Sequence, residues 1–300
     1  MELDKRTVLL AAIDMGNLTR AAERLGYTQS GLSYIIKSLE AEVGFPLLLR
    51  SRTGVQPTAE CRRILPLLRD LEQRNRRLEQ EMADIRGVAV GTVSIASFPC
   101  ISRFWLPDIL RDFKEKYPAI TVALREGGQE DVDSWLRDGV VEMAFCSWQP
   151  DRPYDWVGFM EDDLLAVVPE SHPLAGLKAL PLQEIGDEPF ILEDGIYDHD
   201  IQRALQEAAF SPNVRFTSMD ELAILAMVRV KLGVSILPGL YLREPYPGVA
   251  AIQLDPRVRR RLGVAVPERE ELSPAARRFL KSAQNTFARQ QGYPPQKSDG

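Results

Sequence analysis

The sequence predicts a small helical head, a long linker helix and a C-terminal α/β region made of two Rossmann-like lobes. Three patterns indicate this architecture. Residues 19–44 form two short helical segments around a tight turn, and residues 58–86 carry one narrow apolar stripe at helical spacing. Beyond Gly91, short β-rich runs alternate with helical ones, which is typical of parallel α/β sheets. A chain of 300 residues is long enough for a head and a sizeable core.

The head is predicted to be a winged helix-turn-helix. A short helix over Lys5–Met15 precedes the helix pair. Helices that cross at a tight turn need small residues at their contact, which Ala21 and Ala22 supply, and Gly26 suits the turn itself. Thr28 stands where the second helix needs an N-cap.

The outward face of the second helix is polar, and a basic turn follows it. Hydroxyls and amides there can hydrogen-bond base edges, and a lysine can meet a phosphate. The two arginines of the turn suit the DNA backbone or an adjacent minor groove. The candidate DNA-binding residues are Thr28, Gln29, Ser30, Ser33, Tyr34, Lys37, Arg50 and Arg52. We therefore expect double-stranded DNA as a partner, with an ordinary helical hairpin as the alternative.

Composition limits the other classes of function. The net charge is −6, but residues 1–87 hold 14 basic and 12 acidic side chains, so the acidic excess lies outside the head. Three widely spaced cysteines and two histidines predict reduced thiols, no metal site and no cofactor. Neither a membrane-spanning run nor a signal-peptide pattern is present, so we expect a cytoplasmic protein. Nucleophile–base pairs and phosphate-binding glycine loops are missing, so we expect no enzyme.

Residues 58–86 are predicted to form one linker helix with a heptad seam. Charged residues surround the seam, so the helix needs a partner to bury it, and Asn75 can pair with its own symmetry mate. The seam consists of Cys61, Leu68, Asn75 and Met82 at a positions and of Ile64, Leu71, Leu78 and Ile85 at d positions. A homodimer would carry two heads and would bind an interrupted palindromic operator. Packing of the seam on the same chain is the alternative.

A second set of β-rich and helical runs begins near residue 163, so the α/β region is predicted to contain two lobes. The expected strands cover residues 92–97, 120–124, 142–146, 164–169, 189–193, 214–218 and 233–239, and the expected helices cover residues 101–117, 132–139, 199–209, 221–232 and 274–288. The predicted domain limits are 1–57 for the head, 58–87 for the linker, 92–162 with 268–292 for lobe I, 163–267 for lobe II and 293–300 for a tail.

Two such lobes place a ligand-binding cleft where the carboxyl ends of their strands meet, often beside helix N-termini. The candidate effector-binding residues are Ser97, Phe98, Pro99, Cys100, Gly128, Gln129, Cys146, Ser147, Ile196 and Tyr197. Each also has an ordinary explanation as a cap, a turn residue or a core residue. A thiol at a helix N-terminus can be reactive, so a redox-sensing regulator that uses Cys100 is an alternative.

The chain resembles the LysR-type transcriptional regulators. The residues that carry the resemblance are Ala21-Ala22, Leu25, Thr28-Gln29, Ser33, Ile36-Lys37-x-Leu39-Glu40, Gly44, Pro46-Leu47 and Arg50. The family usually has Pro and Ala at Ser30 and Gly31, Phe at Leu48, and Leu-Thr-x-x-Gly where Pro57 and Thr58 lead to Cys61. These departures affect the expected operator sequence and leave the DNA-binding role unchanged.

The resemblance implies a ligand-controlled transcriptional regulator whose sensor is similar to the periplasmic ligand-binding proteins. It also implies that crossovers near residues 161–163 and 266–270 join the two lobes, that the last helix returns to the first lobe, and that dimers associate into a homotetramer that bends DNA. Ser97 and Gln129 are the closest matches to the family's polar effector contacts. Many members bind small carboxylates, so the resemblance makes a carboxylate one candidate for the effector. No arginine stands at the matched positions, although Arg103 and Arg125 are near. A solute-binding protein is a further alternative, which the head argues against.

Overall fold

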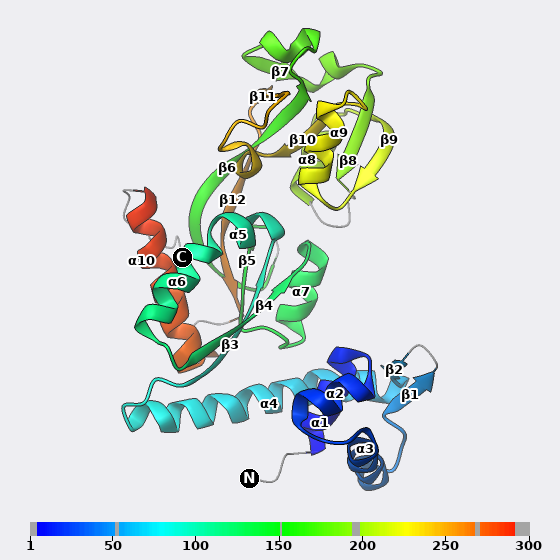
Figure 1. Cartoon of the computed structure of the whole chain (residues 1–300), viewed down its shortest axis with the longest axis vertical. Coiled ribbons are helices and arrows are strands. Elements are labelled where there is room, and N and C mark those ends of the chain that lie inside the picture. The colour runs from blue at the N-terminus through cyan, green and yellow to red at the C-terminus, as the bar shows by residue number, and fades with distance from the viewer. Residues whose placement is uncertain (1–4, 52–53, 151, 194–198, 268–270, 292–300) are drawn as a thin grey trace. The chain divides into compact units, whose positions relative to one another are not determined.

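The structure is a computed structural model that describes residues 5–51, 54–150, 152–193, 199–267 and 271–291 (Figure 1). Within these ranges the chain forms two compact units. The first contains the N-terminal 86 residues, and the second contains most of the chain from Gly87 onward. No helix of the described ranges combines the length and the apolar character needed to cross a membrane.

The first unit is the predicted winged helix-turn-helix, followed by the linker helix. Its elements are α1 (Lys5–Met15), α2 (Leu18–Leu25), α3 (Gln29–Val43), the antiparallel strands β1 (Leu48–Ser51) and β2 (Gly54–Pro57), and α4 (Ala59–Ile85). Asn17 begins α2 by accepting two backbone N–H groups of its first turn, and Gly26 ends it with a φ of 72°. The Thr28 hydroxyl accepts the N–H of Gly31, so the predicted N-cap of α3 is confirmed.

The helices and the wing of the head pack around one apolar core. Ala21 and Ala22 are buried there, as their size predicted. The Glu40 carboxylate accepts the backbone N–H groups of Leu47 at 2.7 Å and Leu48 at 3.2 Å, which fixes the end of α3 to the start of the wing. The buried members of this core are Val8, Leu9, Ala12, Leu18, Ala21, Ala22, Leu32, Ile36, Leu39, Leu47, Leu48, Val55 and Cys61.

The heptad seam of α4 divides into two parts. Cys61 belongs to the head core, and Ile64 and Leu68 pack against that core. The prediction that these three positions face a second chain is therefore wrong, because the head itself covers them. The remaining positions are exposed and are called the exposed seam below; they are Leu71, Asn75, Leu78, Met82 and Ile85.

The second unit contains two α/β lobes connected by two long strands, β6 (Asp155–Pro169) and β12 (Arg259–Val266) (Figure 1). The further elements of lobe I are β3 (Gly91–Ser97), α5 (Pro99–Phe104), α6 (Leu106–Lys116), β4 (Ile120–Glu126), α7 (Gln129–Arg137), β5 (Met143–Ser147) and α10 (Pro274–Gln291). Its sheet has the order β4-β3-β5-β12-β6, with β3 parallel to β4 and β5, as the alternating pattern predicted.

Lobe II is built on the second half of β6, which pairs with two antiparallel strands. Its other elements are β7 (Ala179–Pro181), β8 (Pro189–Glu193), α8 (His199–Glu207), β9 (Asn213–Ser218), α9 (Glu221–Arg229), β10 (Ser235–Pro238), β11 (Val249–Asp255) and the 3₁₀ turns Pro173–Gly176, Leu182–Ile185 and Gly239–Leu242. Every expected strand of the sensor is present, with limits shifted by a few residues. The first half of β6 and the strands β7, β11 and β12 were not predicted.

One expected helix is divided in two. Residues 101–117 form parts of α5 and α6, and the chain breaks between them at Trp105. Pro107 has no backbone N–H, and its ring clashes with a carbonyl one turn earlier, which favours a break in the helix before it. Proline is well placed instead in the first turn of a new helix, where α6 has it. The break places the Trp105 ring in the core, with its centroid 4.9 Å from that of Phe287.

The two crossovers lie opposite each other on paired strands. β6 pairs with β12 up to Asp163 and with strands of lobe II from Leu164, so the predicted first crossover is confirmed. The second was expected near residues 266–270, of which residues 268–270 lie outside the described ranges. That expectation is wrong, because β12 already pairs with β5 over Leu262–Ala265 and so belongs to lobe I there. The chain crosses earlier, at Arg259–Arg261.

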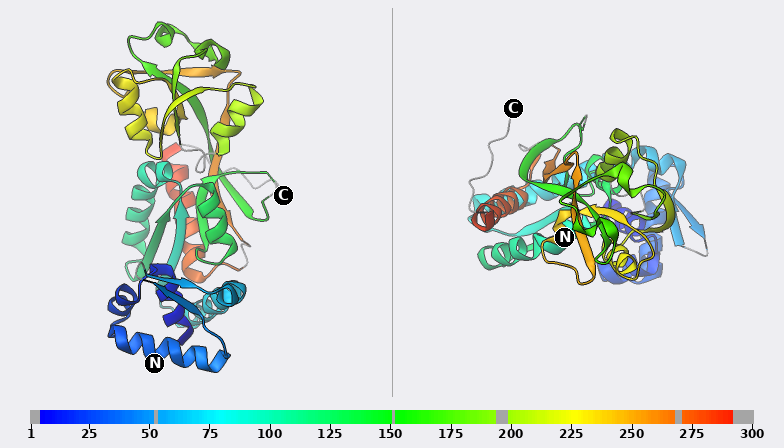
Figure 2. Two further views of the ribbon diagram at one scale, coloured as in Figure 1. Left: turned by 90° about the vertical axis from the view of Figure 1, so that its right-hand side faces the viewer. Right: turned by 90° about the horizontal axis from the view of Figure 1, so that it is seen from above.

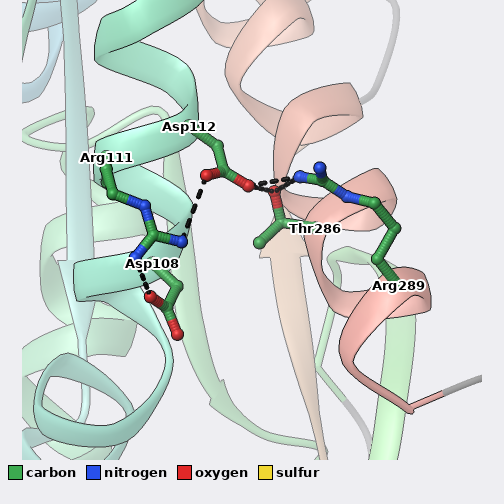
Figure 3. A network of polar contacts seen from close by, with 5 residues as sticks. All are labelled: Asp108, Arg111, Asp112, Thr286 and Arg289. Carbon is green, nitrogen blue, oxygen red and sulfur yellow. Dashed lines mark hydrogen bonds and ion pairs between the residues drawn. The ribbon is translucent and has the colours of Figure 1, made fainter.

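The C-terminal helix α10 lies beside α6, so it returns to lobe I as the resemblance implied (Figure 1, Figure 2). A polar network joins the two helices (Figure 3). The Asp112 carboxylate accepts the Thr286 hydroxyl at 2.9 Å and also pairs with Arg289. On its own helix, Arg111 contacts Asp112 at 3.3 Å and Asp108 at 2.7 Å. The Thr286 hydrogen bond, helped by the two arginines, holds the pKa of Asp112 below its ordinary value.

Asp112→Asn is expected to lower the free energy of unfolding at pH 7 by about 1 kcal/mol. Because the folded-state pKa lies below the unfolded one, the ionised carboxylate stabilises the fold above the ordinary aspartate pKa of about 3.9. This contribution disappears as the pH falls through the folded-state pKa, so the difference between the two proteins should shrink in acid. Urea unfolding at several pH values measures it. Asp108→Asn, at a carboxylate on the same helix but outside the α10 contact, should change stability less; an equal loss would contradict the assignment.

Candidate functional site

The predicted DNA-binding face lies on α3 and at the start of the wing. On the opposite side of α3, Leu32 and Ile36 are fully buried in the head core, so the polar residues form its outward face. Tyr34 is 75% exposed. The other exposed candidates of this face are Thr28, Gln29, Ser30, Lys37 and Arg50, and Ser33 is half-buried. Arg52 lies outside the described residues.

A hydrogen bond joins the recognition helix to the wing. Arg50 donates through Nη1 to the Ser33 hydroxyl at 2.6 Å. If Ser33 contacts a base, its hydroxyl would therefore interact with both the base and Arg50. The Thr28 hydroxyl is likewise engaged as the cap of α3, and it lies 3.2 Å from the Ser30 hydroxyl. Tyr34 and Lys37 project from the same helix as exposed side chains.

The second candidate site is a cavity of about 210 Å³ in the second unit. Four of the predicted effector-binding residues line it, namely Phe98, Pro99, Cys100 and Gly128. Its further lining residues are Glu126, Gly127, Asp131, Glu193, Met219, Glu221 and Arg260. The four predicted residues follow the ends of β3 and β4 in lobe I, whereas Glu193, Met219 and Glu221 come from lobe II. The cavity therefore lies between the two lobes, where strand ends were expected to meet.

Of the other predicted effector-binding residues, Ser97, Gln129, Cys146 and Ser147 do not line this cavity. Gln129, Cys146 and Ser147 line a separate, smaller cavity of about 30 Å³. Ser97 is fully buried, and its hydroxyl donates to the Phe98 carbonyl at 3.0 Å, so it lines neither of these two cavities. Ile196 and Tyr197 lie outside the described residues. Ser97 and Gln129, the two closest matches to the family's polar contacts, are thus not brought together in the larger cavity.

Arg260, which lines the larger cavity, belongs to a buried ion pair. Arg260 is only 2% exposed, and its Nη2 lies 2.9 Å from Asp162 Oδ2. These two residues face each other across the crossover strands β12 and β6. Burial raises the pKa of Asp162, and the Arg260 guanidinium offsets part of that effect. Arg260 also donates to the Cys100 sulfur at 3.4 Å.

Sequence analysis missed Arg260, although a signal was present. Three consecutive arginines stand at the start of β12, and successive side chains of a strand point to opposite faces. Arg259 pairs with Glu161 at the surface, and the Arg261 guanidinium lies 3.6 Å from the centre of the Trp148 ring. Arg260 lies between these two arginines, so its side chain points to the opposite face of the strand, into the interior. The alternation of side chains along a strand is therefore the sequence signal that indicates a buried Arg260.

The lining also contains four carboxylates that sequence analysis did not select, Glu126, Asp131, Glu193 and Glu221. Glu193 and Glu221 are buried. Burial raises the pKa of the Tyr241 hydroxyl, and the charge of Glu221, to which that hydroxyl is hydrogen-bonded, adds to the shift. Within the described ranges, no group of three or more His, Cys, Asp or Glu side chains is arranged to hold a metal ion.

Cys100 lies in the larger cavity wall as a protected thiol. It is 2% exposed, and burial raises its pKa to about 12 despite the nearby Arg260 guanidinium. Since the thiolate is the reactive form, this site does not favour oxidation. Burial also raises the pKa of Cys146. Neither thiol has the exposed, electropositive surroundings typical of redox sensors.

Cys100 in the folded protein is expected to react with iodoacetamide at pH 8 at least about 100-fold more slowly than in urea. The reason is that folding removes both the thiolate and the access to it. Mass spectrometry of labelled peptides over time measures this rate for each cysteine. Labelling of Cys100 as fast in the native protein as in urea would instead support the thiol-based alternative.

Comparison with known proteins identifies both parts of the chain. The profile described as "Bacterial regulatory helix-turn-helix protein, lysR family" matches residues 3–62, and the profile described as "LysR substrate binding domain" matches residues 86–288. The HTH-type transcriptional regulator YvbU of Bacillus subtilis is 29% identical over 290 residues, which cover 96% of this chain and 99% of YvbU.

Solved structures share the whole architecture. Full-length OxyR from Pseudomonas aeruginosa matches with a TM-score of 0.73 at 18% identity and covers 100% of both chains. Full-length CbnR complexed with its target DNA matches with a TM-score of 0.63 at 23% identity, covering 95% of this chain and 100% of CbnR. These similarities confirm the predicted fold class. The chain belongs to the LysR family of DNA-binding transcriptional regulators, with an effector-binding domain of two α/β lobes.

Proposed function

We propose that the chain binds an interrupted palindromic operator as a homodimer, and that a small molecule in the larger cavity controls operator binding or DNA bending. The exposed polar face of α3 carries this proposal, because it presents base-reading side chains on a rigid helix. The bases would be contacted by Gln29, Ser30, Ser33 and Tyr34, with Lys37 and Arg50 on phosphates. Thr28 positions the helix as its cap. The DNA contact of Arg52, which lies outside the described residues, stays a prediction.

The homodimer would form through the exposed seam of α4. Leu78 is 57% exposed and Ile85 is 85% exposed, an arrangement that favours burial against a second copy of the same helix. Two such dimers would associate into a homotetramer. The domain limits proposed are those expected from the sequence, except that β12 belongs to lobe I from Leu262.

The effector would contact Phe98, Pro99, Cys100 and Gly128 between the lobes. It must bind one arrangement of the lobes more tightly than another, since a ligand with equal affinity for both shifts no equilibrium. As in its regulator relatives, the chain would act on DNA in the cytoplasm and would not be an enzyme. The burial of Cys100 favours this ligand-controlled function over a thiol-based one.

Three single variants test the recognition face on the DNA upstream of the protein's own gene. Tyr34→Ala and Ser33→Ala are expected to change base preference at one or two positions, by about 1–3 kcal/mol each. Lys37→Ala should weaken binding to all sequences alike and reduce the salt slope by about one. Titrations of randomised operator pools at several salt concentrations separate these effects.

Lys178→Ala, which removes an exposed lysine of lobe II, serves as the control and should change neither quantity. A uniform loss of affinity in all three α3 variants would show that the recognition face is misplaced. Absence of salt-sensitive binding by the unchanged protein would contradict the proposed function itself.

A further inference from the structure

The charge of the larger cavity restricts the chemical class of its ligand. Among the described lining residues, four carboxylates face a single basic group. Two of these carboxylates, Glu193 and Glu221, are buried, and they come from different elements of lobe II. Glu126 and Asp131 come from lobe I, so acidic groups stand on both sides of the space. A ligand between the lobes would meet negative charge from each of them.

The basic group among the described lining residues is paired with a carboxylate. Arg260 donates through Nε to Asp162 at 3.0 Å, and its Nη2 lies 2.9 Å from Asp162 Oδ2. Arg260 also contacts the Cys100 sulfur. A carboxylate ligand that used the Arg260 guanidinium would compete for it with Asp162.

Two of the acidic lining residues also stand at helix starts. Asp131 accepts the N–H of Gly128 at 3.2 Å at the start of α7, and Glu221 lies in the first turn of α9, where acidic residues suit the helix dipole. Glu193 stands at the end of β8 and Glu126 at the end of β4. These positions are those at which α/β folds contact ligands.

The cavity also has an apolar side and a small size. Phe98, Pro99 and Met219 contribute hydrocarbon surface to the lining. Its volume of about 210 Å³ is below the range of about 300–1,000 Å³ that is typical for drug-sized ligands. Within the described residues, no group of three or more His, Cys, Asp or Glu side chains is placed so that it could hold a metal ion, which favours an organic cation over a bare metal ion.

We propose that the effector is a small organic cation, an amine or guanidinium compound. Glu193 and Glu221 hold its charged group, and its carbon chain packs on Phe98 and Met219. This inference rests on the proposed function, since it takes the cavity between the lobes as the effector site. It assigns a ligand class opposite in charge to the carboxylate that the family resemblance suggested.

Calorimetric and thermal-shift titrations of the purified full-length protein test the proposal. Putrescine and agmatine are the cationic probes, and succinate and benzoate are the anionic ones, all at constant ionic strength. Each cation is expected to raise the melting temperature in a saturable way, because it binds only the folded protein. Glu193→Gln and Glu221→Gln should each raise the Kd of the cations by about 10-fold to 100-fold.

Glu170→Gln is the matched control, because it removes an exposed carboxylate outside the cavity and should leave the Kd unchanged. Glu126→Gln, at an exposed lining residue, gives a second variant that does not disturb the buried core and should weaken binding less. The proposal is wrong if neither cation produces a saturable shift, if the anions bind instead, or if the cation Kd is the same in all four variants. Salt-sensitive operator binding by the same preparation would show in each case that the proposed function still holds.

Discussion

The double variant Leu71→Asp/Leu78→Asp is expected to be a monomer at protein concentrations where the unchanged chain is a dimer. Both leucines belong to the exposed seam of α4, where about one helical turn separates successive seam positions and Asn75 lies between the two leucines. A fully buried leucine contributes about 1.5–3 kcal/mol, and the twofold axis doubles every change. Burial of the new carboxylates adds a further penalty. We therefore expect the dimer dissociation constant to rise by about 1,000-fold or more.

Operator binding should weaken together with dimerisation. A dimer that engages two half-sites gains about 10²–10⁴ in affinity over a single head, and a monomer loses that gain. Sedimentation velocity measures the association, and titration of a full operator and of a half-site measures its consequence. The half-site affinity should stay unchanged, because the substitutions lie outside the head core and the outward face of α3.

Arg76→Asp is the control for these measurements. It also introduces a carboxylate on α4, at a side chain that is exposed but lies outside the seam. Loss of its surface pair with Glu72 should cost little. If Arg76→Asp dissociated the dimer as strongly as the seam variant does, the loss of the dimer would be explained by general charge repulsion and not by the loss of seam burial. A seam variant that remained dimeric would place the interface on another surface.

Local signals predicted the head accurately, because its determinants are close in sequence. Thr28 caps α3 and Gly26 ends α2, and both act within a few residues of their own position. The seam of α4 was predicted only in part. An apolar period of three and four residues is the same whether the stripe packs on its own chain or on another, so Cys61 carried no sign that the head would cover it.

The candidate cavity was harder to predict, because it brings together distant parts of the chain. Strand ends near Phe98 and Gly128 were found from the β-to-helix alternation. Arg260 pairs with a residue 98 positions away, and that pairing depends on the register of β12 against β6. The same register places the second crossover at Arg259–Arg261, earlier in the chain than was expected. Sequence periodicity predicts that a strand exists and which faces alternate, but it does not predict the partner of each residue.

The Arg260–Asp162 pair is expected to give the largest stability change of any single substitution considered. Arg260→Met leaves the Asp162 carboxylate buried without its guanidinium, which costs about 3–5 kcal/mol in comparable buried pairs. Urea unfolding followed by circular dichroism measures the loss. Arg259→Met removes a surface pair with Glu161 from the same strand and should change stability by about 1 kcal/mol or less.

The double variant Arg260→Met/Asp162→Leu separates the pair's net contribution from the cost of breaking it. Replacing both charges by apolar side chains should recover most of the lost stability, since desolvation of a buried pair offsets much of its attraction.

The pH dependence of the stability of Arg260→Met gives an independent check. Burial already raises the pKa of Asp162, and the Arg260→Met variant should raise it further. A folded-state pKa above the unfolded one stabilises the fold below the ordinary aspartate pKa of about 3.9, and this contribution is lost as the pH rises. The deficit of Arg260→Met should therefore grow from pH 4 to pH 8, and a deficit independent of pH would mean that lost packing, not the uncompensated carboxylate, causes it.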